Sequence, residues 1–204
     1  MKSILKTGFS FLFVLAFTKG FSQGTDDRTL FALVQQHASR MGLSAEQAQN
    51  CTISSSFSDE KTGNTYVYLQ QRIHHTRVFN HIKTVIFRGD LLLYHSGQFY
   101  GEPVGEVVPQ VSATAAVIAA AGHLGLSAPE GLRVAEDRMQ VEQKIILSEA
   151  GIARQPITAE LFWVVTSTGT ARLAWNINID VLGSDDWWNV RVDVLTREVL
   201  EQDN

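Results

Sequence analysis

Residues 173–181 read LAWNINIDV, with an apolar side chain at every odd position and a small or polar one at every even position. Successive side chains point to opposite faces of a β-strand, so this alternation predicts a strand with one face in the core and the other toward solvent or a partner. After the turn GSDD at 183–186, residues 187–194 read WWNVRVDV and alternate in the same way. The two stretches predict a long antiparallel hairpin, with Trp187 and Trp188 on opposite faces.

A helix and further short strands precede this hairpin. Ser112 begins an Ala-rich run that continues to Leu124 and stops at Gly125, which predicts a helix capped by a serine hydroxyl. Alternating or apolar segments follow the helix, and they predict strands over 141–147 and 161–165.

The first part of the chain has the same order of helix and then strands. Asp26 and Asp27 favour a helix start, and the apolar residues then recur at helical spacing until Gly42. Ser44, with Gln47 three residues later, resembles a capping box that opens a short second helix. The pattern then becomes alternating and predicts a β-meander, with strands at 53–57, 65–71, 78–87 and 91–94.

Residues 101–109 read GEPVGEVVP, which has no helical or strand period and indicates a linker. The sequence therefore predicts an α+β fold of two small units, each a helix packed on a curved antiparallel β-sheet. The predicted division is a signal peptide at 1–22, a first unit at 23–100, a linker at 101–110 and a second unit at 111–204.

The first residues have the pattern of a secretory signal peptide. Lys2 and Lys6 precede an unbroken apolar run over 9–17, and the small residue Ser22 offers a cleavage point. The run is shorter than the roughly 20 residues that span a bilayer, which favours cleavage over retention as an anchor. We expect a secreted protein, extracellular or periplasmic, with no membrane partner after cleavage. The formal net charge of −4 gives no electrostatic reason to expect a nucleic-acid partner.

The sequence lacks the common catalytic and cofactor motifs. It has no His-Glu-x-x-His zinc motif, no Cys-x-x-Cys pair, no Gly-x-Ser-x-Gly elbow and no glycine-rich phosphate loop, so we expect neither an enzyme nor a cofactor. Cys51 is the only cysteine and has no partner for an internal disulfide. His74, His75 and His81 lie close in sequence and leave a metal site as an alternative, although a solvated turn is the more common role of such a cluster.

Two stretches resemble a known family. Residues 65–71 (TYVYLQQ), followed by residues 78–80 (VFN) and the turn at Gly89, resemble the fungalysin/thermolysin propeptide (FTP) motif. In precursors of fungalysin-type secreted zinc metallopeptidases, a PepSY segment follows this motif. The residues similar to that segment are 174–176 (AWN), 186–193 (DWWNVRVD) and 198–200 (EVL).

The resemblance implies a pro-region that acts as an intramolecular chaperone and as an inhibitor within a zymogen. Its partner would be the catalytic domain of a zinc metallopeptidase, in cis or in trans. The chain ends at Asn204, where the family's catalytic domain would begin, so we expect it to hydrolyse no peptides by itself. A stand-alone secreted peptidase inhibitor acting in trans is the alternative function. The candidate contacts with the partner are Tyr66, Tyr68, Gln71, Trp187 and Arg191.

Two positions depart from the family's pattern. His75 stands where a small turn residue, commonly glycine, is usual, and Arg197 stands where glycine usually follows a residue like Thr196. If these turns require a positive φ, both side chains add local strain or force another turn type.

Overall fold

The first half of the chain, residues 26–100, packs short helices on a four-stranded meander. The structure is a computed structural model that describes residues 26–204, so the predicted signal peptide at 1–22 lies outside the described residues. The helical elements are α1 (Asp27–His37), η1 (Ser39–Met41) and α2 (Ala45–Asn50). The strands are β1 (Thr52–Asp59), β2 (Asn64–Ile73), β3 (Thr76–Arg88) and β4 (Leu91–Ser96). Each predicted strand lies within an observed one, so the meander is confirmed.

The core of the first half lies between its helices and the sheet. Leu30 and Val34 of α1 share a buried cluster with Val67 and Phe87 of the sheet. Cys51 lies in the same cluster, and burial raises the pKa of its thiol to about 11. The predicted capping box at the start of α2 is confirmed, with Ser44 and Gln47 bonding each other's backbone N–H groups at 3.1 and 2.9 Å.

The second half, residues 111–204, packs one main helix on a larger set of strands. Its helices are α3 (Ala113–His123) and α4 (Met139–Glu142). Its strands are β5 (Val134–Arg138), β6 (Lys144–Leu147), β7 (Ile157–Val165), β8 (Ala171–Asp180), β9 (Trp187–Asp193) and β10 (Val199–Asp203). The predicted serine cap is confirmed, since the Ser112 hydroxyl accepts from the Ala115 N–H at 3.2 Å. The predicted hairpin is confirmed as β8 and β9, which pair from Ala174↔Asp193 to Asp180↔Trp187.

The predicted strand over 141–147 is wrong in its first part. Residues 139–142 form the helical turn α4, and Gln143 has a left-handed φ of 53°, so the strand starts only at Lys144. Val141 is 87% exposed and therefore contributes nothing to the apolar face that its spacing indicated. Strands β5 and β10 were not predicted, because neither contains the alternation of a half-buried strand.

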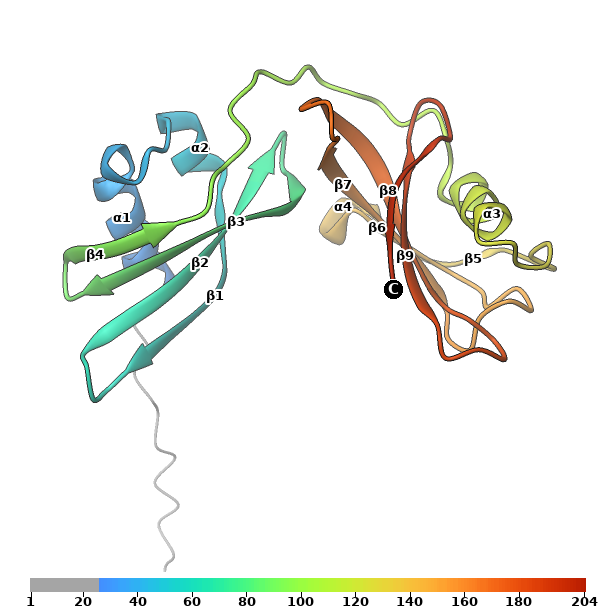
Figure 1. The fold of residues 1–204 in the computed structure, drawn as a ribbon, viewed down its shortest axis with the longest axis horizontal. Helices are drawn as coiled ribbons and strands as arrows, with labels where there is room; N and C mark the ends of the chain where they lie inside the picture. The colour runs from blue at the N-terminus through green and yellow to red at the C-terminus, as the bar shows by residue number, and fades with distance from the viewer. Residues whose placement is uncertain (1–25) are drawn as a thin grey trace, which may run out of the picture.

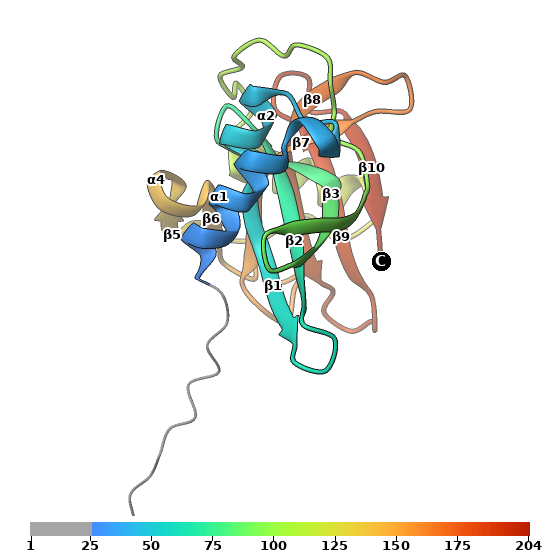
Figure 2. The same cartoon turned by 90° about the vertical axis from the view of Figure 1, so that its left-hand side faces the viewer.

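All strands join into one connected, mostly antiparallel sheet, which confirms the α+β class. Its main order is β1-β2-β3-β7-β8-β9-β10, with β4 beside β3 and with β6 joining β7 to β5. In Figure 1, α1 and α2 cover one side of the first strands and α3 covers the far side of β8 and β9, so the uncovered sides of both halves face the middle of the molecule. Figure 2 looks onto the side that α1 and α2 cover. Among residues 26–204, no helix is long and apolar enough to cross a bilayer.

Strand β3 contributes to both halves because a segment near the start of β3 separates from β2. Gln70 pairs with Ile82 in the regular part of the ladder. Two residues further along β2, Arg72 pairs with Arg77. Gln71 of β2 therefore opposes residues 78–81 of β3, which form a bulge larger than the usual two residues against one.

The bulge carries part of β3 into the second half. Val78 pairs with Trp163 of β7 in a parallel arrangement and is fully buried in the hydrophobic cluster of the second half. Asn80 makes the bend with a left-handed φ of 56°. The Gln70 amide donates to the carbonyl oxygens of Val78 at 2.7 Å and His81 at 3.3 Å, so backbone groups released from the ladder are satisfied.

The turns at His75 and Arg197 both require a positive φ. His74 and His75, with φ of 47° and 66°, form the two-residue turn between β2 and β3. Arg197 has a φ of 67° in the turn between β9 and β10. The positive φ on which the expected local strain depends is therefore found at both turns, and the strain itself stays a prediction.

Candidate partner interface between the two halves

Strand β2 directs alternate side chains into two environments. Val67 and Leu69 are buried on the helix side, while Tyr66 and Tyr68 lie half-buried on the uncovered side. The Phe57 ring stacks on Tyr66 with 4.5 Å between centroids. The pairing register continues this surface across β3 and β4. We call it the aromatic face, and its residues are Phe57, Tyr66, Tyr68, Ile86 and Tyr94.

The uncovered side of the second half is polar. One row crosses four neighbouring strands at paired positions and consists of Lys144, Glu160, Asn176 and Arg191. In the next row, the Asn178 amide donates to the Asn189 side-chain oxygen at 3.0 Å. The Trp187 indole N–H donates to Asn178 Oδ1 at 2.7 Å, yet 57% of this residue is exposed. We call these seven residues the polar face.

The start of β3 holds the two halves together. The Trp163 indole N–H donates to the carbonyl of Ile73 at 3.0 Å, and the Gln143 amide donates to Thr76 Oγ1 at 2.9 Å. Arg77 forms an ion pair with Glu160. These contacts fix the position of the β2–β3 hairpin against β7.

An aromatic and arginine stack extends the same contact. The Phe79 and Phe162 rings meet edge to face at 6.1 Å between centroids. The Arg77 guanidinium lies 4.6 Å from the centre of the Phe162 ring, and the Arg191 guanidinium lies 3.8 Å from that of Phe79. At these distances a cation is attracted by the electron-rich face of the ring.

Arg191 is the most buried charged residue of this region. It is 1% exposed and forms an ion pair with Asp203 of β10. Its Nε has no hydrogen-bond partner, and neither does the Oδ1 of Asn176, the residue paired with it across the strands. The guanidinium thus joins the C-terminal strand to Phe79 of the first half.

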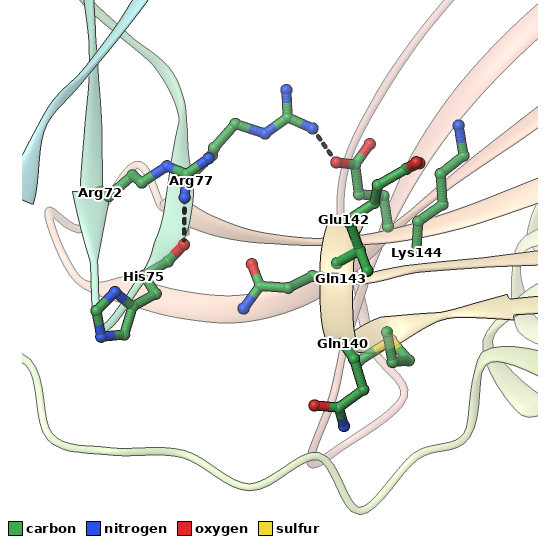
Figure 3. A pocket seen from close by; sticks show the side chains of 10 residues that line it. Arg72, His75, Arg77, Gln140, Glu142, Gln143 and Lys144 are labelled. Atoms are coloured by element: carbon green, nitrogen blue, oxygen red, sulfur yellow. Dashed lines mark hydrogen bonds and ion pairs between the residues drawn. The ribbon is translucent and has the colours of Figure 1, made fainter. Parts of the chain in front are cut away.

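A groove of about 690 Å³ opens beside the junction. In Figure 3, Arg72, His75 and Arg77 come from the β2–β3 hairpin, and α4 with the start of β6 forms the other wall. Burial, and secondly the charge of Arg72, lowers the pKa of Arg77 from its ordinary value. We call this the charged groove; its polar and charged lining residues are Arg72, His75, Arg77, Gln140, Glu142, Gln143, Lys144 and Glu160.

The predicted contact residues fall into two groups. Tyr66, Tyr68 and Trp187 lie on the uncovered faces. Gln71 is buried, and its side chain exchanges two hydrogen bonds with the backbone of Tyr100 at 2.7 and 2.8 Å. Arg191 is buried beneath Phe79 as described above. Both buried side chains therefore have partners within the chain, and their contact with another protein stays a prediction.

The histidines highlighted by the sequence do not converge. His74 bonds the carbonyl of Val104 at 2.7 Å, and His81 bonds that of Phe79 at 2.8 Å. In the part of the chain that the structure describes, no group of three histidine, cysteine, aspartate or glutamate residues is placed to hold a metal ion.

Sequence reasoning missed the residues that join the two halves. Phe79 and Phe162 read as ordinary strand residues, and the polar row depends on the register of strands far apart in sequence. Asn80, in the stretch VFN at 78–80, was the one available signal of the bend in β3, since asparagine is among the few residues that adopt a left-handed backbone readily.

No family model matches the chain, and no curated protein matches it. Among solved structures, the C-terminal domain of YpeB from Bacillus megaterium aligns with a TM-score of 0.39 and 7% sequence identity. The alignment covers 89% of this chain and 66% of that one, so the present chain spans just under two thirds of that structure.

Proposed function

We propose that the chain is a pro-region of a secreted zinc metallopeptidase, which assists folding of the catalytic domain and inhibits it until processing. One observation carries the proposal. The two stretches that resemble pro-region motifs lie in β2 and in the β8–β9 hairpin; β2 places Tyr66 and Tyr68 on an uncovered face, and the hairpin places Trp187 on another. In this proposal the chain itself is not an enzyme.

The accessible aromatic residues have the properties of contact anchors. Phe57, Tyr94 and Trp187 are 52%, 53% and 57% exposed. Aromatic side chains are enriched among the residues that dominate binding energy, because a large rigid surface is buried at little cost in conformational entropy. The asparagines beside Trp187 supply adaptable polar contacts around it.

Inhibition of a purified fungalysin-type zinc peptidase by residues 23–204 tests the proposal. The chain is titrated against hydrolysis of a peptide substrate, and refolding of the denatured peptidase is followed with and without it. We expect saturable inhibition, faster recovery of activity and no turnover attributable to the chain. No inhibition together with no effect on refolding would overturn the proposal.

Two matched variants locate the contact. Trp187→Ala should weaken inhibition by about tenfold or more, as for an aromatic anchor. Ile118→Ala is the control, because Ile118 is 53% exposed on α3, on the side of the sheet away from Trp187. An equal loss in both variants would exclude Trp187 as a specific anchor.

A further inference from the structure

The charged groove has positive charge without an acidic partner. Its two acids are already paired, Glu160 with Arg77 and Glu142 with Arg138 at 3.4 Å. Among residues 26–204, Arg72 and Lys144 form no ion pair. The unbalanced charge is therefore cationic, although the chain as a whole has a formal charge of −4.

The two arginines of the hairpin face each other. Arg72 and Arg77 occupy directly opposed positions on β2 and β3, where like charges destabilise a strand pair. The guanidinium of Arg72 donates to the carbonyl of His75 at 3.2 Å, and its buried Nε has no partner. An anion in the groove would relieve this repulsion, since it would supply the acidic partner that Arg72 lacks.

The unpaired cations lie on opposite walls. Figure 3 places Arg72 on the hairpin and Lys144 on the wall formed by α4 and β6. A volume of about 690 Å³ accommodates a short stretch of polypeptide between them. A ligand with two anionic groups along its length would therefore reach both cations.

We propose that the charged groove binds an acidic segment of a polypeptide through carboxylates paired with Arg72 and Lys144. A polypeptide segment spaces its carboxylates along its length and can therefore meet cations on both walls, whereas inorganic phosphate concentrates nearly two negative charges at one point. The assignment of this segment to the peptidase partner rests on the proposed function. Binding of a carboxylate ligand to the groove does not.

Calorimetric titration with an acetylated and amidated tetraglutamate tests the site directly, using residues 23–204 at low ionic strength. We expect saturable binding that weakens with added salt, and no binding of the matching tetraglutamine. Arg72→Gln and Lys144→Gln should each raise Kd by roughly fivefold, as for loss of one partly screened ion pair. Glu142→Gln should lower Kd by about twofold, because it removes a negative charge from the wall.

Lys61→Gln is the matched control, because Lys61 lies in the β1–β2 turn at the other end of the hairpin and should leave Kd unchanged. Lys144→Gln keeps the test decisive if the Arg72 variant fails to fold. Absence of tetraglutamate binding, equal binding of tetraglutamine, or an equal loss in Lys61→Gln would overturn the proposal. If inorganic phosphate binds more tightly than tetraglutamate, and if Arg72→Gln and Lys144→Gln abolish its binding, the assignment of the ligand as a carboxylate is overturned.

The two proposals fail separately. If the chain inhibits the peptidase but does not bind tetraglutamate, the groove proposal falls and the proposed function stands. If tetraglutamate binds but the peptidase is unaffected, the groove stands as a carboxylate site and its assignment to the peptidase falls.

Discussion

Arg197 occupies a backbone conformation that suits glycine better than arginine. Its φ of 67° lies in the left-handed region, where the Cβ of an L-residue crowds the backbone. The sequence already drew attention to this position, because Arg197 stands where glycine is usual in the motif that the sequence resembles. The conformation itself is imposed by the turn, in which the Arg197 N–H donates to the Asp193 carbonyl at 3.1 Å.

Arg197→Gly should stabilise the protein. Removal of the side chain relieves strain of about 1–2 kcal/mol, and the greater freedom of glycine in the unfolded chain offsets part of it, which leaves a gain of about 0.5–1 kcal/mol. Urea unfolding measures the change. Arg88→Gly is the control, since Arg88 ends β3 without a positive φ, so glycine relieves no strain there and should destabilise the protein. A stability equal to or below that of the parent would contradict the prediction.

Burial of individual polar residues was beyond sequence reasoning. Tyr66, Tyr68 and Gln71 were predicted together as partner contacts, but β2 directs Gln71 to the buried side of the strand. There its side chain exchanges hydrogen bonds with the backbone of Tyr100, which is 29 residues away. Long-range partners of this kind leave no mark on the local pattern.

At the scale of elements, strands with one buried face were predictable and α4 was not. The buried faces of β2 and β8 have the alternation that their pairing requires, whereas both faces of β9 are buried from Val190 to Asp193. Residues 141–147 show similar spacing, but the strand that forms there has only four residues. Its preceding turn is set by the left-handed Gln143, whose side chain bonds Thr76 of the first half.

The turn between β9 and β10 depends on one buried carboxylate. Asp193 is 3% exposed, and its Oδ1 accepts from Leu195 N–H, Thr196 N–H and the Thr196 hydroxyl at 2.7–3.0 Å. Arg172 Nε donates to Oδ2 at 2.9 Å. Local sequence does not reveal this role, because an isolated aspartate on an alternating strand gives no sign of these donors.

Asp193→Asn should destabilise the protein by about 2 kcal/mol at pH 7, because the amide replaces an ionised acceptor of several hydrogen bonds. Burial alone raises the pKa of Asp193, but the hydrogen bonds and Arg172 outweigh it and lower the pKa below 3.8. The carboxylate therefore stabilises the fold above about pH 3.8, and this contribution is lost as the pH falls through the folded-state pKa.

Urea unfolding of parent and variant at pH 7 and pH 3 measures both effects, and the difference between them should shrink on acidification. The control is Asp185→Asn, because the Asp185 side chain is fully exposed and lies 3.7 Å from Arg154. A difference that stays constant with pH would assign the effect of Asp193 to packing rather than charge.

At the scale of the whole molecule, the junction is small and is built around Phe79. This ring packs against Phe162 and covers the buried Arg191. Most helices and strands, apart from α4, β5 and β10, follow from local periodicity, as does the break at 101–109. How the two halves meet does not, because it depends on a bulge that removes one segment of β3 from its own hairpin.

Phe79→Ala should weaken the coupling between the halves. It removes the ring that covers Arg191 and leaves a cavity at the junction, for a loss of about 2–4 kcal/mol. Scanning calorimetry should then show two separate transitions in place of one, and small-angle scattering should show a larger radius of gyration. Phe57→Ala is the control, since Phe57 is a half-exposed aromatic residue on β1, away from the junction. A single unchanged transition for Phe79→Ala would contradict this role.

The two-residue turn at His74 and His75 also limits how this sequence can diverge. Deleting or inserting one residue there would shift the start of β3 by half a strand period and rotate Arg77 and Phe79 to the opposite side. Surface loops usually accept such length changes between homologues, whereas this turn has a fixed length. An alignment of remote relatives should therefore place no gap between β2 and the bulge of β3, and gaps should gather in residues 101–110.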